Sequence, residues 1–393
     1  MKIKDTYTRL YGVIFSAYVG SGPIYWIPWV NIKVIDVLKY TLFFVIVLWP
    51  IIVGSSFSKF QFPGGKKALL LFVGYFLLSI PSLLQGEQVD STYRLLNTIQ
   101  IFLFLFGCGF LIHKKIIKSV VHLSVRIFIF FCILSLFLMQ VIPDYVSPLN
   151  DGLYLSQTGL GGSRTGWSPS IALFLPWLYS GFVISSGFWL WVAAFSMVAN
   201  QILVAGRTGM VAALIPFLFY GVFRKSIKVL VLVVIVVGVF GLFAINNLEL
   251  LRLDVGGFGN RADLDELSTG RTGNYARSID EIASNPVAGY GTGSNGSLGV
   301  HNIILRSAME GGVFYSFIII VLLFFGLYRG WIGMAKRDWF VASAFMTVLS
   351  GVVTSFFEPL AMFGSFNSAG FWWLCFAVCV SFGQQRPYKS TRR

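Results

Sequence analysis

Long apolar stretches, rarely interrupted by charge, are the feature of this chain that most restricts its fold. A helix of about 20 residues crosses the hydrocarbon layer of a membrane and satisfies its own backbone polar groups there. Charged residues make up 12% of the chain, against about 25% in ordinary globular proteins. The sequence therefore predicts an all-α polytopic membrane protein with about 12 transmembrane helices. Their expected ranges are 8–23, 35–54, 68–86, 95–112, 120–142, 169–186, 188–205, 209–223, 228–246, 311–328, 339–357 and 368–383.

Basic residues define the expected orientation. With a cytoplasmic N-terminus, the basic residues cluster in alternate loops, as the positive-inside pattern requires. Of the 16 acidic residues, only Asp5 and Asp338 fall on the cytoplasmic side. Both termini are therefore expected in the cytoplasm. The net charge of +14 reflects topology and attraction to lipid headgroups, so no nucleic-acid partner is expected. The basic loop residues are Lys59, Lys66, Lys67, Lys114, Lys115, Lys118, Arg224, Lys225, Lys228, Arg329, Lys336 and Arg337.

Two long outer loops interrupt the spans within a single transmembrane domain, 1–393. We place them at 143–168 and 247–300, with a basic cytoplasmic tail at 384–393. The second loop is far longer than usual connections, which points to a functional or disordered segment. Its stretches at 263–267 and 275–283 are amphipathic, so we expect short helices lying across the outer surface.

A short motif, Arg-Thr-Gly, occurs three times on the expected outer face. The arginines are Arg164, Arg207 and Arg271, each followed by Thr and Gly. A guanidinium beside flexible backbone amides can approach an anion closely. Arg207 matters most, because it lies between two spans, where a charge is costly unless it is used. The alternative interpretation is that each arginine caps a helix C-terminus or extends to the membrane interface.

A glycine-rich turn precedes the one histidine on the expected outer face, His301. Gly291, Gly293 and Gly296 match a dinucleotide-binding spacing, but no strand precedes them, so we reject that reading. The turn instead lets the chain fold back to present His301. An imidazole can take the proton of a sugar hydroxyl, although a lone histidine is often structural.

The residues after His301 follow a helical pattern. On a helix, Asn302, Leu305 and Arg306 would share the surroundings of His301, and Glu310 lies about two turns further on.

Cofactor and metal motifs do not occur in the sequence. It has no His-x-x-x-His, no aspartate-rich triplet and no phosphate loop. The four cysteines lie inside apolar stretches, which is typical of small buried side chains. We therefore expect no metal site and no cofactor.

Together these motifs resemble the O-antigen ligase and O-antigen polymerase superfamily, most strongly over 160–315. The resemblance rests on Arg207 at a helix mouth, Gly270-Arg271 before an amphipathic stretch, Asn-Pro-x-x-Gly-x-Gly, and His-Asn-x-x-Leu-x-x-x-x-Glu-x-Gly. It implies a multi-spanning, GT-C-like glycosyltransferase of the bacterial inner membrane. Such an enzyme would transfer a glycan from undecaprenyl diphosphate at the periplasmic face by a metal-independent, inverting reaction.

The resemblance also implies residue roles and partners. Arg207 and Arg271 would hold the diphosphate, and His301 would act as general base or orient the acceptor. The remaining candidates are expected to bind substrate, and Arg164 among them fits the family pattern less well. The partners would be a lipid-linked donor glycan, an acceptor glycan, membrane lipids and, as a candidate, a chain-length regulator. The expected substrate-binding residues are Arg164, Gly291, Gly293, Asn302, Arg306 and Glu310.

Three functions fit the sequence to different degrees. A polymerase joins lipid-linked repeat units of O-antigen, capsule or exopolysaccharide, whereas a ligase moves the glycan to lipid A-core. We favour the polymerase. A lipid-linked glycan flippase is the third reading. Flippases usually place ionisable residues at mid-membrane and show internal repeats, whereas the charges here gather at the outer rim.

Overall fold

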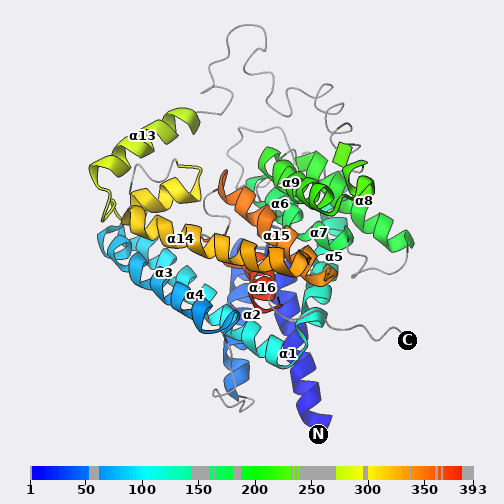
Figure 1. The fold of residues 1–393 in the computed structure, drawn as a ribbon. Coiled ribbons are helices and arrows are strands. Elements are labelled where there is room, and N and C mark those ends of the chain that lie inside the picture. The colour runs from blue at the N-terminus through cyan, green and yellow to red at the C-terminus, as the bar shows by residue number, and fades with distance from the viewer. Residues whose placement is uncertain are drawn as a thin grey trace.

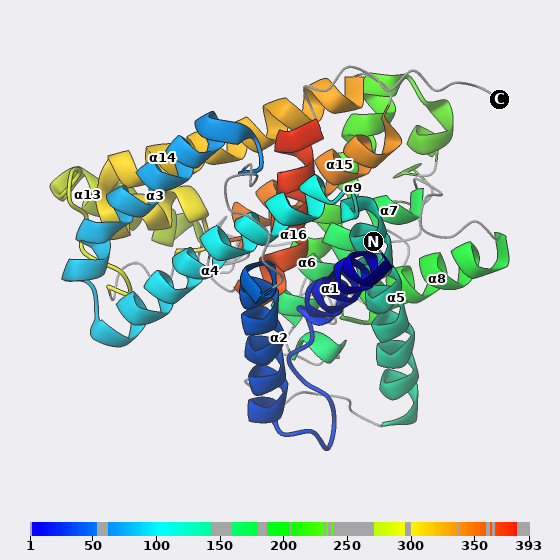
Figure 2. The ribbon, with the colours of Figure 1, turned by 90° about the horizontal axis from the view of Figure 1, so that it is seen from below.

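A computed structural model shows the chain as an assembly of helices (Figures 1 and 2). The structure describes residues 2–52, 62–142, 159–162, 164–179, 187–204, 206–231, 233–234, 238, 271–294, 300–335, 338–358, 362–363 and 366–382. Among these residues there is no β-strand, which confirms the all-α prediction for this part of the chain.

Most of the helices coincide with the predicted apolar stretches. They are α1 (Lys2–Ser21), α2 (Ile32–Ile52), α3 (Gly65–Gln85), α4 (Gln88–His113), α5 (Ile117–Val141), the 3₁₀ turn η2 (Gly159–Gly161), α6 (Arg164–Phe174), α7 (Pro176–Tyr179), α8 (Gly187–Val204), α9 (Arg207–Arg224), α13 (Arg271–Ser284), α14 (Ile303–Ala335), α15 (Trp339–Ser355) and α16 (Phe366–Phe382).

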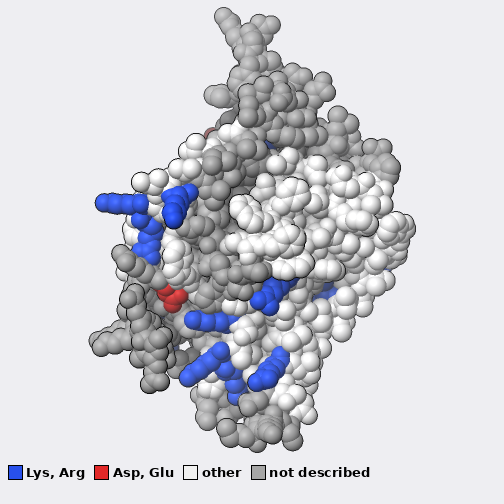
Figure 3. Space-filling model, turned by 90° about the vertical axis from the view of Figure 1, so that its right-hand side faces the viewer, with Lys and Arg blue, Asp and Glu red and all other residues white. Residues whose placement is uncertain are grey.

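Length and composition support a polytopic membrane protein. Within the described ranges, six helices are long and apolar enough to cross a membrane: α2, α3, α4, α5, α8 and α14. α15 and most of α16 are shorter apolar helices. The surface is apolar too, since α2 exposes Val37, Phe44 and Ile52. Figure 3 shows the same property, because the right-hand half of the face shown is almost free of charged side chains.

Two predicted spans differ from the helices found. The sixth, predicted at 169–186, is not one helix, because α6 ends at Phe174 and α7 begins at Pro176. Proline has no N–H to continue a helix but is well tolerated at a helix start. The tenth, predicted at 311–328, extends over 303–335 with a kink at Gly312 (φ 81°, ψ 175°). There Val313 N donates to Pro286 O at 2.8 Å.

Other predictions fall wholly or partly beyond the described residues. These are most of the span at 228–246, the loop residues 143–158, the stretch at 263–267 and the tail at 384–393. The amphipathic stretch predicted at 275–283 is helical and forms most of α13.

The core is aromatic and centres on α16. Trp372 and Trp373 are fully buried, and α16 lies at the centre of both ribbon views (Figures 1 and 2). Phe174 of α6 stacks between Phe128 of α5 and Phe371 of α16, with ring centroids 3.9 and 3.7 Å apart. Such stacks bury large areas and fix helix spacing, so α16 holds α5 and α6 in register.

Several segments that were predicted to be cytoplasmic meet at one end of the assembly. The end of α9 lies beside the start of α15, with the rings of Tyr220 and Trp339 6.0 Å apart. Arg329 Nη2 of α14 donates to Val380 O of α16 at 2.7 Å. Lys118 Nζ of α5 lies 5.3 Å from the Phe340 ring centroid.

Candidate functional site

Each Arg-Thr-Gly motif forms the first turn of a helix. Arg164 begins α6, Arg207 begins α9 and Arg271 begins α13. A helix N-terminus carries partial positive charge and presents backbone N–H groups. The N-cap of α9 is Gly206, which has no side chain to cap the helix. The motif thus combines a guanidinium with a helix end that favours anions.

The starts of α6 and α9 lie side by side. Ser168 Oγ donates to Gly206 O at 2.9 Å and accepts from Gln201 Nε2 at 2.6 Å. A Cβ added at Gly209 would lie 2.0 Å from Ser168 Oγ, so only glycine allows this approach. The backbones of Arg164 and Arg207 are therefore brought to the same end of the assembly.

The C-terminal end of α15 lies level with the start of α9. The two helices are antiparallel, since Ser350 Oγ donates to Ala212 O at 2.8 Å while Tyr220 lies beside Trp339. Arg207 is five residues before Ala212, and Ser355 is five residues after Ser350. Five residues span roughly 7.5 Å of helix, so Arg207 and Ser355 lie at similar heights.

Tyr275 connects α13 to His301 and to the end of α15. Its hydroxyl donates to His301 O at 2.9 Å and lies 3.4 Å from Phe356 O. Tyr275 is one helical turn after Arg271. The start of α13, His301 and the end of α15 are therefore neighbours, although far apart in the sequence.

Glu358, just after α15, faces the ring of His301. Its Oε2 lies 3.7 Å from Nδ1 of His301, and the side chains are 16% and 42% exposed. Glu358 was not among the predicted site residues. The available signal was its position as the first residue after the predicted outer end of the eleventh span.

Gly291 and Gly293 pack against neighbouring backbone and side chains. Both have positive φ, 89° and 76°, and both are buried. Gly291 N donates to Glu310 O at 2.9 Å, and a Cβ there would lie 2.5 Å from the carbonyl carbon of Gln85. At Gly293 a Cβ would lie 2.2 Å from Asp90 Oδ2. The loop thus closes the gap between α14 and the α3–α4 turn, and substrate contact by these glycines stays a prediction.

Arg306 and Glu310 form a buried ionic cluster with Arg94 of α4. Glu310 Oε2 lies 2.6 Å from Arg94 Nη2, and Oε1 accepts from Arg306 Nε at 2.8 Å. All three side chains are less than a tenth exposed. Arg94 was not among the predicted site residues.

Asn302 holds the start of α14. Its Oδ1 accepts from the backbone N–H groups of Ile304 and Leu305, at 2.9 and 3.2 Å. This is the geometry of a helix N-cap. His301 therefore precedes the helix and is not part of it.

Of the three arginines in the repeated motif, only Arg207 has a side chain that the structure describes. The side chain of Arg207 is half-buried. The side chains of Arg164 and Arg271 lie outside the described part, so a shared pocket with His301 stays a prediction.

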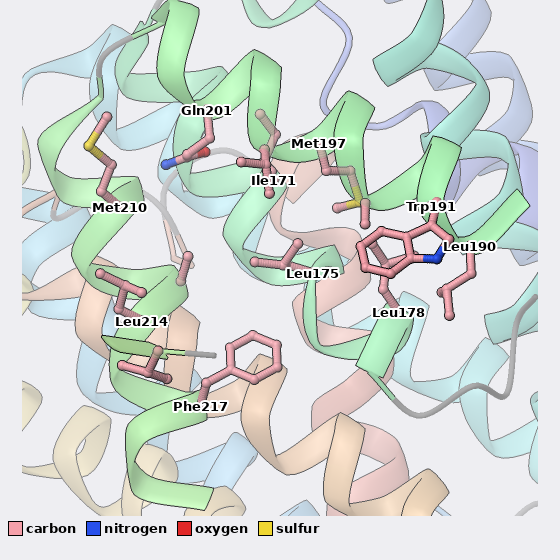
Figure 4. A pocket seen from close by; sticks show the side chains of 14 residues that line it. Ile171, Leu175, Leu178, Leu190, Trp191, Met197, Gln201, Met210, Leu214 and Phe217 are labelled. Carbon is pink, nitrogen blue, oxygen red and sulfur yellow. The ribbon is translucent and has the colours of Figure 1, made fainter. Parts of the chain in front are cut away.

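An apolar cavity lies below the start of α9 (Figure 4). Its volume is about 290 Å³, and its walls come mainly from α6, α8 and α9. Met210, on the first turn of α9, and Gln201 line it together with aliphatic and aromatic residues. Gln201 Oε1 is buried and has no hydrogen-bond partner among the described residues.

No metal centre is found among the described residues, because no three His, Cys, Asp or Glu side chains group closely there.

Apolar helices of membrane length, with arginine-led helix starts and a histidine toward one end, define a polytopic membrane protein with a polar site. Residues 190–315 match the family model described as O-antigen ligase. This part of the chain is thus similar to the O-antigen ligase family, which supports the resemblance to the O-antigen ligase and polymerase superfamily. A search of curated proteins finds none that matches. The matched range contains Arg207, Arg271 and His301, and it points to glycosyl transfer of the ligase or polymerase type.

Proposed function

We propose that this chain polymerises oligosaccharide repeat units carried on undecaprenyl diphosphate, at the periplasmic face of the bacterial inner membrane. The observation that carries the proposal is that Arg207 and Arg271 each begin a helix, toward the end of the assembly that holds His301. Two positive helix ends, each with an arginine, suit a diphosphate. The similarity to the O-antigen ligase family supports the same substrate class.

The proposed reaction is a single inverting displacement. The acceptor hydroxyl loses its proton to His301, and its oxygen attacks the anomeric carbon of the donor glycan. The bond from that carbon to the diphosphate breaks, and the electron pair leaves with the lipid diphosphate. Arg207 and Arg271 stabilise the charge that develops on this leaving group, which is usually the largest catalytic contribution in such sites.

We propose that the cavity between α6, α8 and α9 binds the start of the lipid chain. It is apolar apart from Gln201 and lies next to the first turn of α9, which begins with Arg207. A diphosphate held at the helix start would leave the first isoprene units close to the cavity. Burial of this apolar chain adds binding free energy in proportion to the area removed from water.

Ligation of the glycan to lipid A-core is the second candidate, because the matching family is described as O-antigen ligase. A strain that lacks the gene separates the two. Single repeat units on the lipid carrier indicate a polymerase, and long chains that stay on the carrier indicate a ligase. Surface polysaccharide of normal length and amount in that strain would contradict both.

A further inference from the structure

We propose that Glu358 is a positioning residue for His301, holding Nδ1 so that Nε2 of the ring acts as the base. This inference rests on the proposed glycosyl transfer. It selects the base role for His301 over simple orientation of the acceptor. It also adds a residue that lies outside the matched O-antigen ligase range, 190–315.

The ring of His301 has one buried side. Nδ1 is buried and has no hydrogen-bond partner among the described residues. The side chain as a whole is nevertheless 42% exposed. The exposed part of the side chain therefore lies away from Nδ1. Glu358 Oε2, 3.7 Å from Nδ1, belongs to the wall on the buried side.

The backbone around this pair is held from three directions. Tyr275 of α13 donates to the carbonyl of His301 and approaches the carbonyl of Phe356, two residues before Glu358. Glu358 N donates to Thr354 O of α15 at 2.7 Å. Asn302, the residue after His301, is the N-cap of α14. Imidazole and carboxylate therefore face each other from anchored segments.

The chemistry of a base requires this arrangement. A neutral imidazole carries one N–H, and a carboxylate at Nδ1 keeps that hydrogen there and leaves the Nε2 lone pair free. The distance of 3.7 Å between His301 Nδ1 and Glu358 Oε2 is longer than that of a hydrogen bond. Catalytic hydrogen bonds often tighten only when substrate binds. During transfer Nε2 takes the acceptor proton, and the carboxylate offsets the positive charge of the imidazolium.

Kinetics with purified full-length protein and a lipid-linked donor test the assignment. Glu358→Ala is expected to lower kcat about 100-fold, within the range for a general base, and to leave KM within about twofold. Glu358→Gln keeps an acceptor oxygen but loses the negative charge, so it is expected to lower kcat less than Glu358→Ala and still below the wild-type value. The matched control is Glu281→Ala on α13, which should keep full activity. Equal activity of Glu358→Gln and wild type would overturn the inference.

A second readout reports the ring directly. The chain has three histidines, so replacing His113 and His122 with Gln leaves His301 as the one ¹⁵N-histidine signal. We expect the Nδ1–H tautomer in this background and its loss in Glu358→Ala. An Nε2–H tautomer with Glu358 present would contradict the inference.

The two proposals fail differently. If His301→Ala abolishes transfer while both Glu358 variants keep wild-type activity, the dyad is wrong and the proposed function stands. If His301→Ala is also fully active, the base role proposed for His301 is wrong as well.

Discussion

An arginine at the first position of a helix opposes the helix dipole, because the N-terminus already carries partial positive charge. Arg164, Arg207 and Arg271 all hold that position. The arrangement becomes favourable when an anion sits at the helix end and neutralises both charges. The position of the repeated motif thus supports the proposed anionic substrate.

Replacing Arg207 or Arg271 with Ala is expected to reduce transfer roughly 100- to 1000-fold, as the loss of one donor to a developing anion does. Arg271→Lys should also be impaired, since an ammonium lacks the planar fork of the guanidinium. Initial rates with purified protein measure this. Arg277→Ala, exposed on the same helix, is the control. A fully active Arg271→Ala would remove Arg271 from the mechanism.

Glu310 contacts two buried arginines, Arg94 and Arg306, in the ionic cluster. Glu310→Gln removes the negative charge that compensates the two buried guanidinium groups. It is expected to cost about 3–5 kcal/mol of stability. Thermal unfolding in detergent measures the loss. Unchanged unfolding with a raised KM would instead support the predicted role of Glu310 in substrate binding.

Single residues differ in how far the sequence could identify them. The arginine motif and the His-Asn block are local patterns, so they are recognisable in the sequence. Arg94 and Glu310 are 216 positions apart, and their pairing depends on how α4 meets α14. Glu358 has no motif around it. Such long-range pairs depend on tertiary packing, which no local sequence pattern reveals.

At the scale of helices, the approach of α6 to α9 aligns two arginine-led starts. Gly209→Ala would place a methyl group against Ser168, so we expect the helices to separate, with a stability loss of about 1–3 kcal/mol and reduced activity. Gly187→Ala, at the start of α8, meets no atom within 4 Å and is the matched control. If both variants behave alike, close packing at Gly209 is not required.

The helices themselves were largely predictable, because apolar length determines them. The positions where a predicted span is divided or kinked were harder to predict. Pro176 divides the sixth span because a proline starts a new helix. The kink at Gly312 needs positive φ and a bond from Val313 N to Pro286 O, so it depends on the distant glycine loop.

At the scale of the molecule, the cavity between α6, α8 and α9 predicts sensitivity to the length of the lipid chain. Leu214→Trp should fill it and raise KM several-fold for a donor with a long prenyl chain, with a smaller effect for a short-chain donor. Leu218→Trp, one turn away and exposed, serves as the control. Equal effects on both donors would place the lipid chain elsewhere.

The most direct test uses the purified chain in lipid vesicles with an undecaprenyl-diphosphate-linked glycan, an acceptor glycan and a metal chelator. Mass spectrometry then measures extended glycan and free undecaprenyl diphosphate together. We predict one free undecaprenyl diphosphate for each new glycosidic bond with the wild-type chain, and a fall of both to background with Arg207→Ala. No release of the lipid diphosphate by the wild-type chain, or equal release by Arg207→Ala, would contradict the account.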